Sequence, residues 1–437
     1  MQIVSQLVFA LVFITAVFLI RGRILFIKKN ISMGKSTSNK SKGDEARLRL
    51  RNMLMVALGQ KKMFKRLIPA TLHLAVYLGF LLINIEVLEI VLDGMLGTHR
   101  LFLSWMGEVY GMMINFFEFL AVLVIVACLV FIVRRHVLKV ARFQSSEMRR
   151  WPKVDALLIL LFEIALMIAI LVMNGADQAL QARGVLGYHH TGILFFSHLL
   201  VPIFQGLDTS MLIVIERVAW WLHIVGILSF GYYITYSKHL HLALAFPATF
   251  WARLMSQGKM INMDEVTTEV QSMLGLETSN EVAGEVPRLG AKDVEDLTRK
   301  NLLDAYSCSE CGRCTSVCPA NMTGKKLSPR KILMDTRDRM EEKGKEIKQG
   351  IVSKKALLGD FITAEEINAC TTCNACTEAC PINLNPLEII LGLRRYAAME
   401  ESSSPAQWNQ MYSNIETSFS PWKFPAQDRF KWKDDLK

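Results

Sequence analysis

The chain has 437 residues, of which 51% are hydrophobic and 21% are charged, and its formal net charge is +10. This length suffices for a membrane domain and a soluble domain. The basic residues lie mostly beside long apolar runs, as lipid topology demands, so the charge does not indicate a nucleic-acid-binding protein. Eight of the nine cysteines lie in two tight motifs, which argues against a secreted disulfide framework.

Five apolar runs have the length of a membrane helix. The first, residues 3–20, lacks the basic start and the cleavage site of a secretory signal, which predicts a retained first helix over 1–30. The other four approach the twenty residues that a bilayer core requires, and they lie at 67–92, 108–133, 154–173 and 211–236. The apolar stretch 193–204 is too short to cross, so we expect it to be interfacial or re-entrant.

Lysine and arginine predict the orientation of these spans. Residues 21–66 contain fourteen of them and 134–153 contain seven, whereas 93–107 and 174–210 contain one each. Because positive residues are retained on the cytoplasmic side, we expect the N-terminus outside and the C-terminal part in the cytoplasm. The basic segment 31–66 would then be cytoplasmic, and the protein would span the inner (cytoplasmic) membrane several times.

Histidines are the first candidate ligands. Imidazole is costly in hydrocarbon unless it is paired or coordinating, and a b-type haem needs two histidines from neighbouring helices. His73 lies early in the second span, and the fifth carries His223 near its middle and His241 at its cytoplasmic end. On one continuous helix His223 and His241 would be about 27 Å apart, so they could serve two haems but not one. A hydrogen-bonded packing role is the alternative for each. Three others are expected at the interface: His189, His190 and His239.

The sequence around these histidines resembles the γ subunit of respiratory nitrate reductase and its relatives in membrane-bound heterodisulfide reductases and sulfite-metabolism complexes. The matching residues are Leu72-His73, Gly79, Leu222-His223, Ser237-Lys238 and His241. The resemblance implies a five-helix, quinone-reactive haem b domain over 67–252. It further implies that His73 and His241 hold the haem nearer the cytoplasm and that His223 is one ligand of an outer haem.

The ligand set of the outer haem is where this chain departs from that family. The family has the second outer ligand ten residues after His73, and this sequence has Ile83 there. Either one haem binds, or His198 on the outer side replaces the missing histidine.

Acidic residues within the spans are a second group of candidates, because charged groups in lipid are expensive and often functional. Glu216 and Arg217 on the fifth span and Glu86 on the second are expected toward the outer side, where a quinol could lose its protons. Pairing between helices is the alternative. The same two interpretations apply to Glu89, Glu118 and Glu163.

Two cysteine motifs, CSECGRCTSVCP at 308–319 and CTTCNACTEACP at 370–381, follow a polar linker over 253–300. Each has the spacing C-x2-C-x2-C-x3-C-P, in which three cysteines bind one cubane and the fourth crosses to the other cluster. Two structural zinc sites are the alternative, but zinc gains nothing from the third cysteine or the proline. We therefore predict two [4Fe–4S] clusters, one held by Cys308, Cys311, Cys314 and Cys380 and the other by Cys370, Cys373, Cys376 and Cys318.

The domain around these motifs, over 301–396, is expected to be helical, because the residues between Cys318 and Cys370 are charged and poor in β-branched types. The tail, 397–437, is expected to be loop-like. Its tryptophans would form an aromatic cover on this domain or, alternatively, a docking arm for a partner.

The cysteine stretches resemble the helical ferredoxin domain of heterodisulfide reductase and glycolate oxidase iron–sulfur subunits. The order of the two halves further resembles membrane-bound oxidoreductases that link electron-transferring flavoprotein to menaquinone. Those relatives contain or pair with a Cys-Cys-Gly domain, which this sequence lacks, and it also lacks nucleotide-binding glycine motifs. Substrate chemistry is thus expected on a partner, either a cytoplasmic Cys-Cys-Gly iron–sulfur protein or an electron-transferring flavoprotein.

The combined interpretation is an all-α protein, with a five-helix transmembrane bundle followed by a cytoplasmic helical ferredoxin domain. We expect it to be the quinone-reactive electron-transfer subunit of an oxidoreductase complex, with two clusters, one or two haems b and menaquinone as substrate. The alternatives are a membrane-anchored redox sensor and a redox-linked ion-pump component.

Overall fold

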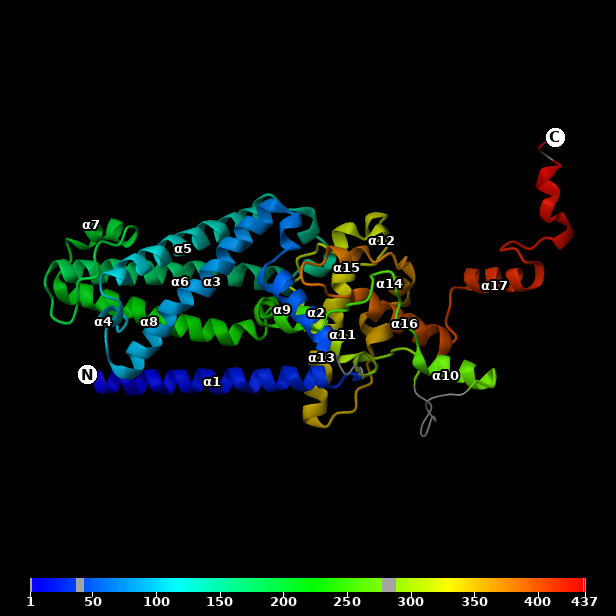
Figure 1. The fold of residues 1–437 in the computed structure, drawn as a ribbon, viewed down its shortest axis with the longest axis horizontal. Coiled ribbons are helices and arrows are strands. Elements are labelled where there is room, and N and C mark those ends of the chain that lie inside the picture. Colours follow the sequence, from blue (N-terminus) through cyan, green and yellow to red (C-terminus); the bar gives the residue numbers. More distant parts are fainter. Residues whose placement is uncertain (1, 37–42, 277–287, 435, 437) are drawn as a thin grey trace.

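The computed structural model describes residues 2–36, 43–276, 288–434 and 436. Within these ranges the regular structure is helical, and extended backbone pairs only at two isolated bridges. A bundle of long helices lies at one end of the molecule and a domain of shorter helices at the other (Figure 1). We call the bundle end that contacts this domain the junction end and the opposite end the distal end. The all-α prediction is confirmed for the described residues.

Five helices are long and apolar enough to cross a membrane. They are α1 (Gln2–Ser32), α3 (Leu67–Leu96), α5 (Glu108–Ile132), α6 (Trp151–Ala182) and α8 (Thr209–Ile234). The α6 helix packs against both α5 and α8, α3 packs on α5, and α1 lies along α3 and α8. Large apolar side chains remain exposed around the bundle, as expected for helices that face lipid. The five predicted spans are therefore present.

Local sequence signals mark where several of these helices begin or end. Gly97, with a φ of 72°, ends α3 in the left-handed conformation that glycine adopts without steric cost. Pro152 lies in the first turn of α6, where its missing N–H costs nothing. The Asp208 carboxylate accepts a hydrogen bond from the Met211 backbone N–H at 3.3 Å and caps α8.

The stretch 193–204 does not cross the bundle, as predicted. It forms η6 (Ser197–Leu200) and α7 (Val201–Phe204), which pack on α6 at the distal end (Figure 1). The buried Glu118 carboxylate of α5 accepts hydrogen bonds from the Phe196 and Ser197 backbone N–H groups, each at 3.1 Å. A buried acid thus satisfies a turn that would otherwise carry unpaired donors.

The fifth span does not continue to His241, which corrects the expectation of one unbroken helix. The α8 helix ends at Ile234, a single turn η7 (Lys238–Leu240) follows, and α9 (His241–Phe250) begins anew. The Ser237 hydroxyl accepts a hydrogen bond from the His239 backbone N–H at 3.1 Å and stabilises the break. The chain therefore changes direction just before His241.

The second domain is built on α11 (Arg299–Ser307), α13 (Pro329–Gln349) and α16 (Pro386–Met399). These helices share an apolar core with the end of α1 and with α9. Short helices carry the cysteine motifs between them: α12 (Pro319–Met322), α14 (Ala364–Ala369) and α15 (Ala375–Ala379). The remaining short elements are α2 (Gly43–Met53), η1 (Leu54–Leu58), η2 (Met63–Lys65), α4 (Leu103–Met106), η3 (Val133–Val137), η4 (Ala141–Phe143), η5 (Ser146–Met148), η8 (Val294–Asp296), η9 (Thr315–Val317) and η10 (Leu357–Phe361).

Buried ion pairs join this domain to the bundle. Arg330 of α13 is fully buried, and its guanidinium donates to Glu147 and to the Arg142 carbonyl, both at 2.7 Å. On another side of the junction Arg23 of α1 pairs with Glu341 of α13 at 2.6 Å. Removing one partner of a buried pair costs about 3–5 kcal/mol. The two parts are therefore held in one fixed arrangement.

The contact between α13 and α1 gives a test of this interface. A Cβ atom at Gly344 would collide with the buried side chain of Asn30, whose amide donates to the Tyr306 hydroxyl at 2.8 Å. We expect Gly344→Val to lower the free energy of unfolding by about 1–3 kcal/mol, because Asn30 would have to give up this bond. Thermal unfolding in detergent measures the change, with Lys345→Val on the exposed face as control. Equal midpoints for the two variants would contradict the close packing.

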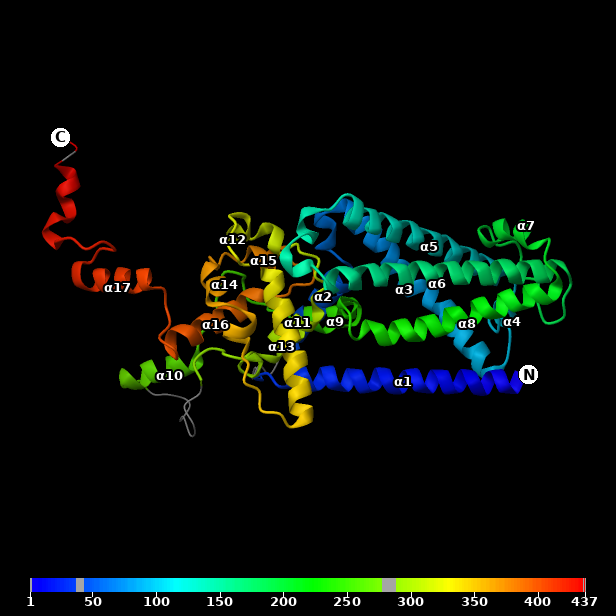
Figure 2. The same ribbon diagram turned by 180° about the vertical axis from the view of Figure 1, so that it is seen from behind.

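The linker agrees with its prediction, whereas the tail does not. The linker contains the short amphipathic helix α10 (Asp264–Met273), as expected, while 277–287 lies outside the described residues. The tail is not loop-like: it forms α17 (Ala406–Ser418) and η11 (Ala426–Lys433) and projects away from the domain (Figures 1 and 2). Trp422 and Trp432 are 71% and 60% exposed, so the expected aromatic cover is wrong.

Candidate redox centres

The first cysteine group lies where the α11–η9 loop meets the end of α15. A small cavity of about 20 Å³ is lined by five cysteines: Cys308, Cys311, Cys314, Cys376 and Cys380. Gly312 has a φ of 70° and Glu310 one of 55°, which lets the loop turn tightly around the sulfur atoms. The Leu384 backbone N–H donates to Cys380 Sγ at 3.3 Å. Two cysteines of the second motif, Cys376 and Cys380, thus lie beside the first motif, and Cys380 is the one that the spacing predicts as fourth ligand.

The second group combines Cys318 with the later motif. Burial raises the pKa of Cys370, and the neighbouring thiols of Cys318 and Cys373 add to the shift. Burial likewise raises the pKa of Cys376 to about 11, with Cys370 and Cys318 nearby. The Thr372 backbone N–H donates to Cys370 Sγ at 3.4 Å. Cys318 thus lies near members of the later motif, and the exchange of fourth cysteines between the motifs stays a prediction.

The donors of both groups are thiols, which are ligands of cubane clusters and of zinc. Cysteines of a cubane bind separate irons and stand farther apart, whereas four ligands of zinc surround one ion. Burial raises the pKa of Cys308 to about 12, so this thiol is protonated at neutral pH. A metal that binds it displaces the proton, which is released to solvent.

The two groups differ in access to solvent. Cys373 of the second group is exposed, whereas Cys308 and Cys314 of the first are buried. Cys311 is partly accessible because it faces a larger cavity at the junction. The first group is thus directed toward the bundle and the second toward the surface.

This larger cavity, which we call the histidine cavity, has a volume of about 300 Å³ and lies between the bundle and the cysteine domain. His73 and His241 both line it, and their ring centres are 6.5 Å apart. When two imidazoles bind one metal ion from opposite sides, each with a metal–nitrogen distance of about 2 Å, their ring centres lie about 6 Å apart. The spacing therefore fits a single metal between the two rings, and the break before α9 makes this approach possible.

Hydrogen bonds orient both rings. His73 Nδ1 lies 3.2 Å from the Gln60 side-chain oxygen, and His241 Nδ1 donates to the Lys238 carbonyl at 3.0 Å. Each ring thus keeps Nε2 free for coordination. Histidines that bind a metal commonly have such a hydrogen bond on the other ring nitrogen, which fixes the orientation of the ring. The donor set fits the bis-histidine haem that the sequence predicts.

The rest of the cavity wall is suited to a large group with apolar and anionic parts. Its apolar side chains come from α3, α5, α6 and α9. Burial, with several arginines nearby, lowers the pKa of Arg142 to about 10, so an anion beside it would be stabilised. Four buried polar atoms in the wall have no hydrogen-bond partner among the described residues: Tyr77 Oη, Arg135 Nη1, Arg142 Nε and Glu163 Oε1. Haem propionates are the kind of group that the arginines would bind.

The other histidines are placed differently. His223 is fully buried, its Nδ1 donates to the Leu166 carbonyl at 3.0 Å, and its Nε2 has no partner in the described structure. This donor fits the predicted role of His223 as a ligand, which stays a prediction. His198 is exposed on η6, and Ile83 is packed in the bundle core. His239, expected at the interface, instead lines the histidine cavity with its ring centre 5.4 Å from that of His241.

Most of the intramembrane acids are paired, which favours the structural alternative for them. Glu89 accepts from the Phe102 backbone N–H at 2.8 Å and from Tyr110 at 2.7 Å. Glu216 pairs with its neighbour Arg217. Glu86 and Glu163 are the exceptions in this group, because a buried Oε1 of each has no hydrogen-bond partner in the described residues.

Arg100 was not singled out by sequence reasoning, although it organises the distal end. Its guanidinium donates to Asp177 at 2.6 Å, Asn174 at 2.8 Å and Tyr110 at 3.0 Å. Its backbone N–H donates to Asp93 at 2.8 Å. A lone arginine in the loop 93–107 was therefore the available signal for a buried polar cluster.

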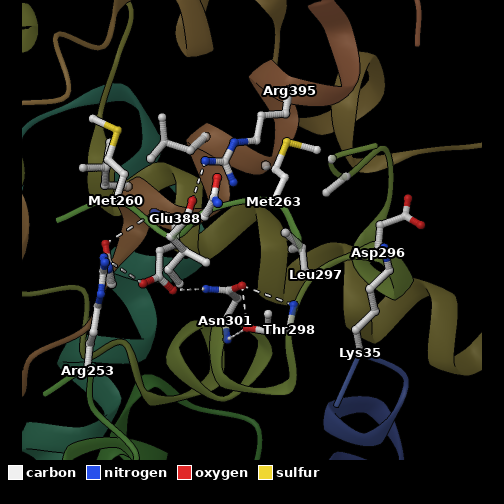
Figure 3. Close-up of a pocket in the computed structure, with 18 of the residues that line it drawn as sticks. Lys35, Arg253, Met260, Met263, Asp296, Leu297, Thr298, Asn301, Glu388 and Arg395 are labelled. Atoms are coloured by element: carbon white, nitrogen blue, oxygen red, sulfur yellow. Dashed lines mark hydrogen bonds and ion pairs between the residues drawn. The ribbon is translucent and has the colours of Figure 1, made fainter. Parts of the chain in front are cut away.

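A further cavity of about 190 Å³ lies between the linker and α16 (Figure 3). Its charged groups pair with one another: Glu388 lies 3.4 Å from Arg253 and accepts from Asn301 at 3.1 Å. Arg395 donates to the Ile261 carbonyl at 2.6 Å. These bonds tie the linker to the domain, which is a structural role.

Known proteins match the part that carries the cysteines and also nearly the whole chain. Residues 307–384 match the 4Fe-4S dicluster domain family. The probable iron-sulfur-binding oxidoreductase FadF of Bacillus subtilis is 28% identical over 96% of this chain and 59% of its own length. The EtfAB:quinone oxidoreductase of Syntrophomonas wolfei is 25% identical over 55% of this chain and 34% of its own. A component of a CoB-CoM heterodisulfide reductase from Methanosarcina acetivorans is 32% identical over 25% of this chain and 56% of its own.

These matches indicate the class of the protein. The chain carries a dicluster iron–sulfur domain and five helices fit to span a membrane, and its relatives are oxidoreductases and subunits of redox complexes. They indicate a membrane-anchored iron–sulfur electron-transfer protein. The chain spans less than two thirds of the length of each of these relatives. No solved structure matches it.

Proposed function

We propose that this protein passes electrons between a cytoplasmic redox partner and menaquinone through two [4Fe–4S] clusters and haem b. The clusters would be held by the two cysteine groups in a domain over 301–396. The haem would be held by His73 and His241 in a membrane domain over 67–252. When bound, these groups supply one-electron carriers that need little rearrangement.

The observation that carries the proposal is the shared wall of the histidine cavity. His73, His241 and Cys311 all line it, so a haem ligated there would lie against the first cysteine group. The second group, with the exposed Cys373, would then exchange electrons with a soluble partner. The chain's own residues bind, orient and insulate the carriers along this line.

The nature of the partners is inferred from the relatives. One relative is named for both EtfAB and a quinone, which supports an electron-transferring flavoprotein and a quinone as partners here. The likeness to heterodisulfide reductase components supports a Cys-Cys-Gly iron–sulfur protein as the other soluble partner. The lysine and arginine distribution supports a cytoplasmic cysteine domain and a bundle in the inner membrane.

A quinol titration tests the proposal. We expect a menaquinol analogue, added to anaerobically purified protein in detergent, to reduce haem b and then the clusters, or the reduced clusters to be reoxidised by the quinone. Optical and EPR spectra follow each carrier. A membrane-anchored redox sensor predicts clusters without haem and without any response to quinol. If neither direction gives a spectral change and quinone-site inhibitors have no effect, the function is wrong.

A further inference from the structure

A buried lysine at the junction touches the surroundings of both candidate redox centres. Lys238 of η7 is 7% exposed, and it lies between the bundle and the first cysteine loop. Its ammonium contacts the Glu310 carboxylate at 2.5 Å, the Asp155 carboxylate at 3.6 Å and the Pro152 carbonyl at 2.6 Å. A lysine this deeply buried needs such partners to remain charged.

The backbone of the same residue holds a candidate haem ligand. The Lys238 carbonyl accepts the Nδ1 hydrogen bond of His241 at 3.0 Å and leaves Nε2 directed to metal. The Lys238 backbone N–H in turn donates to Asp155 at 3.3 Å. Asp155 of α6 therefore binds the backbone of the residue whose carbonyl orients His241.

The side chain holds the loop of the first cysteine group. Glu310, which Lys238 binds, stands between Cys308 and Cys311 and has a φ of 55°, a conformation that is strained for a residue other than glycine. Arg337 of α13 binds the other Glu310 oxygen at 3.0 Å. Glu310 is 3% exposed, so the two cations clamp it from the bundle side and from the domain side. The clamp maintains the strained turn.

We propose that Lys238 is a positioning residue that sets the relative placement of the His241 ring and the Cys308–Cys311 loop. Its carbonyl orients the His241 ring, and its ammonium holds the Cys308–Cys311 loop through Glu310. The inference rests on the proposed function for its meaning in electron transfer, but the contacts themselves concern only this chain.

Three variants of the full-length protein test the inference. Lys238→Met removes the ammonium and keeps most of the stem, and Lys238→Arg keeps the charge. Arg23→Met breaks another buried ion pair at the same junction, with Glu341, which does not contact a cysteine loop. Iron, sulfide and haem b content, the EPR spectrum of the reduced clusters and the rate of reduction by a menaquinol analogue are measured for each.

We expect Lys238→Met to keep its iron but to show an altered EPR signal for one cluster and reduction about tenfold slower or more. Lys238→Arg should restore most of both, and Arg23→Met should keep the wild-type EPR spectrum. A wild-type spectrum and rate in Lys238→Met would overturn the inference, as would the same losses in Arg23→Met.

Two outcomes separate this inference from the proposed function. If quinol does not reduce the wild-type clusters and quinone does not reoxidise them, the function fails and the EPR comparison alone decides the role of Lys238. If Lys238→Met does not fold, Glu310→Gln replaces it, because this change keeps the shape of the side chain and removes its charge. An unchanged EPR spectrum in Glu310→Gln then overturns the inference.

Discussion

Replacing Cys380 with serine is expected to remove one cluster and leave the other. Cys380 belongs to the second motif by sequence, but it shares a cavity with Cys308, Cys311 and Cys314. Serine binds iron poorly, so the iron content should fall from about eight to about four atoms per chain. Iron and acid-labile sulfide analysis measures the loss, and EPR of the reduced protein should show one cluster signal in place of two.

The matched control is Cys128→Ser, because Cys128 is buried in α5 and belongs to neither group. Its iron content should equal that of the wild type. The complementary change is Cys318→Ser, which should remove the cluster of Cys370, Cys373 and Cys376 instead. If each serine variant lost the cluster of its own motif, the exchange of fourth cysteines would be wrong.

Replacing His73 with alanine is expected to abolish haem binding in the histidine cavity. The variant leaves His241 as the one ring of the facing pair, and a b-type haem needs both. A pyridine haemochrome assay should give no haem b if the protein holds one haem, and half the wild-type content if it holds two. His189→Ala, at an exposed position on the distal side, should keep the full content.

The same assay decides between one and two haems. His223→Ala removes the buried ring whose Nε2 has no partner in the described residues, and His198→Ala removes the exposed ring on η6. Loss of haem in both variants would support a second haem with His198 as its other ligand. Full haem content in His73→Ala would contradict the assignment of the histidine cavity.

Composition and local spacing were enough to predict the larger features. The five spans follow from long apolar runs, because burial in lipid makes hydropathy a strong constraint. The iron–sulfur domain follows from the spacing of the two motifs, because residues 307–384 match a 4Fe-4S dicluster domain, whereas the exchange of fourth cysteines stays a prediction. The helical character of the domain between them was also correct.

The break before His241 could not be predicted in the same way. Residues 235–240 contain neither glycine nor proline, and the turn depends on Ser237 and on the distant Asp155. The same break moves His239 from the expected interface into the cavity wall. Tertiary contacts across tens of residues decide such turns, and a single sequence does not display them.

The tail and the distal cluster were missed for a related reason. Aromatic residues are equally consistent with burial and with exposure, so composition could not show that α17 projects away from the domain. Arg100 looked like an ordinary loop residue, because its partners Asn174 and Asp177 lie on another helix.

The burial of the first cysteine group beneath the junction has a consequence for biogenesis. Cys308 and Cys314 are closed off once Arg330 and Lys238 have engaged their partners. If this group holds a cluster, as proposed, its iron and sulfide would have to be delivered before the C-terminal half docks on the bundle, because docking buries Cys308 and Cys314. A chain that closed too early would be trapped without its inner cofactor.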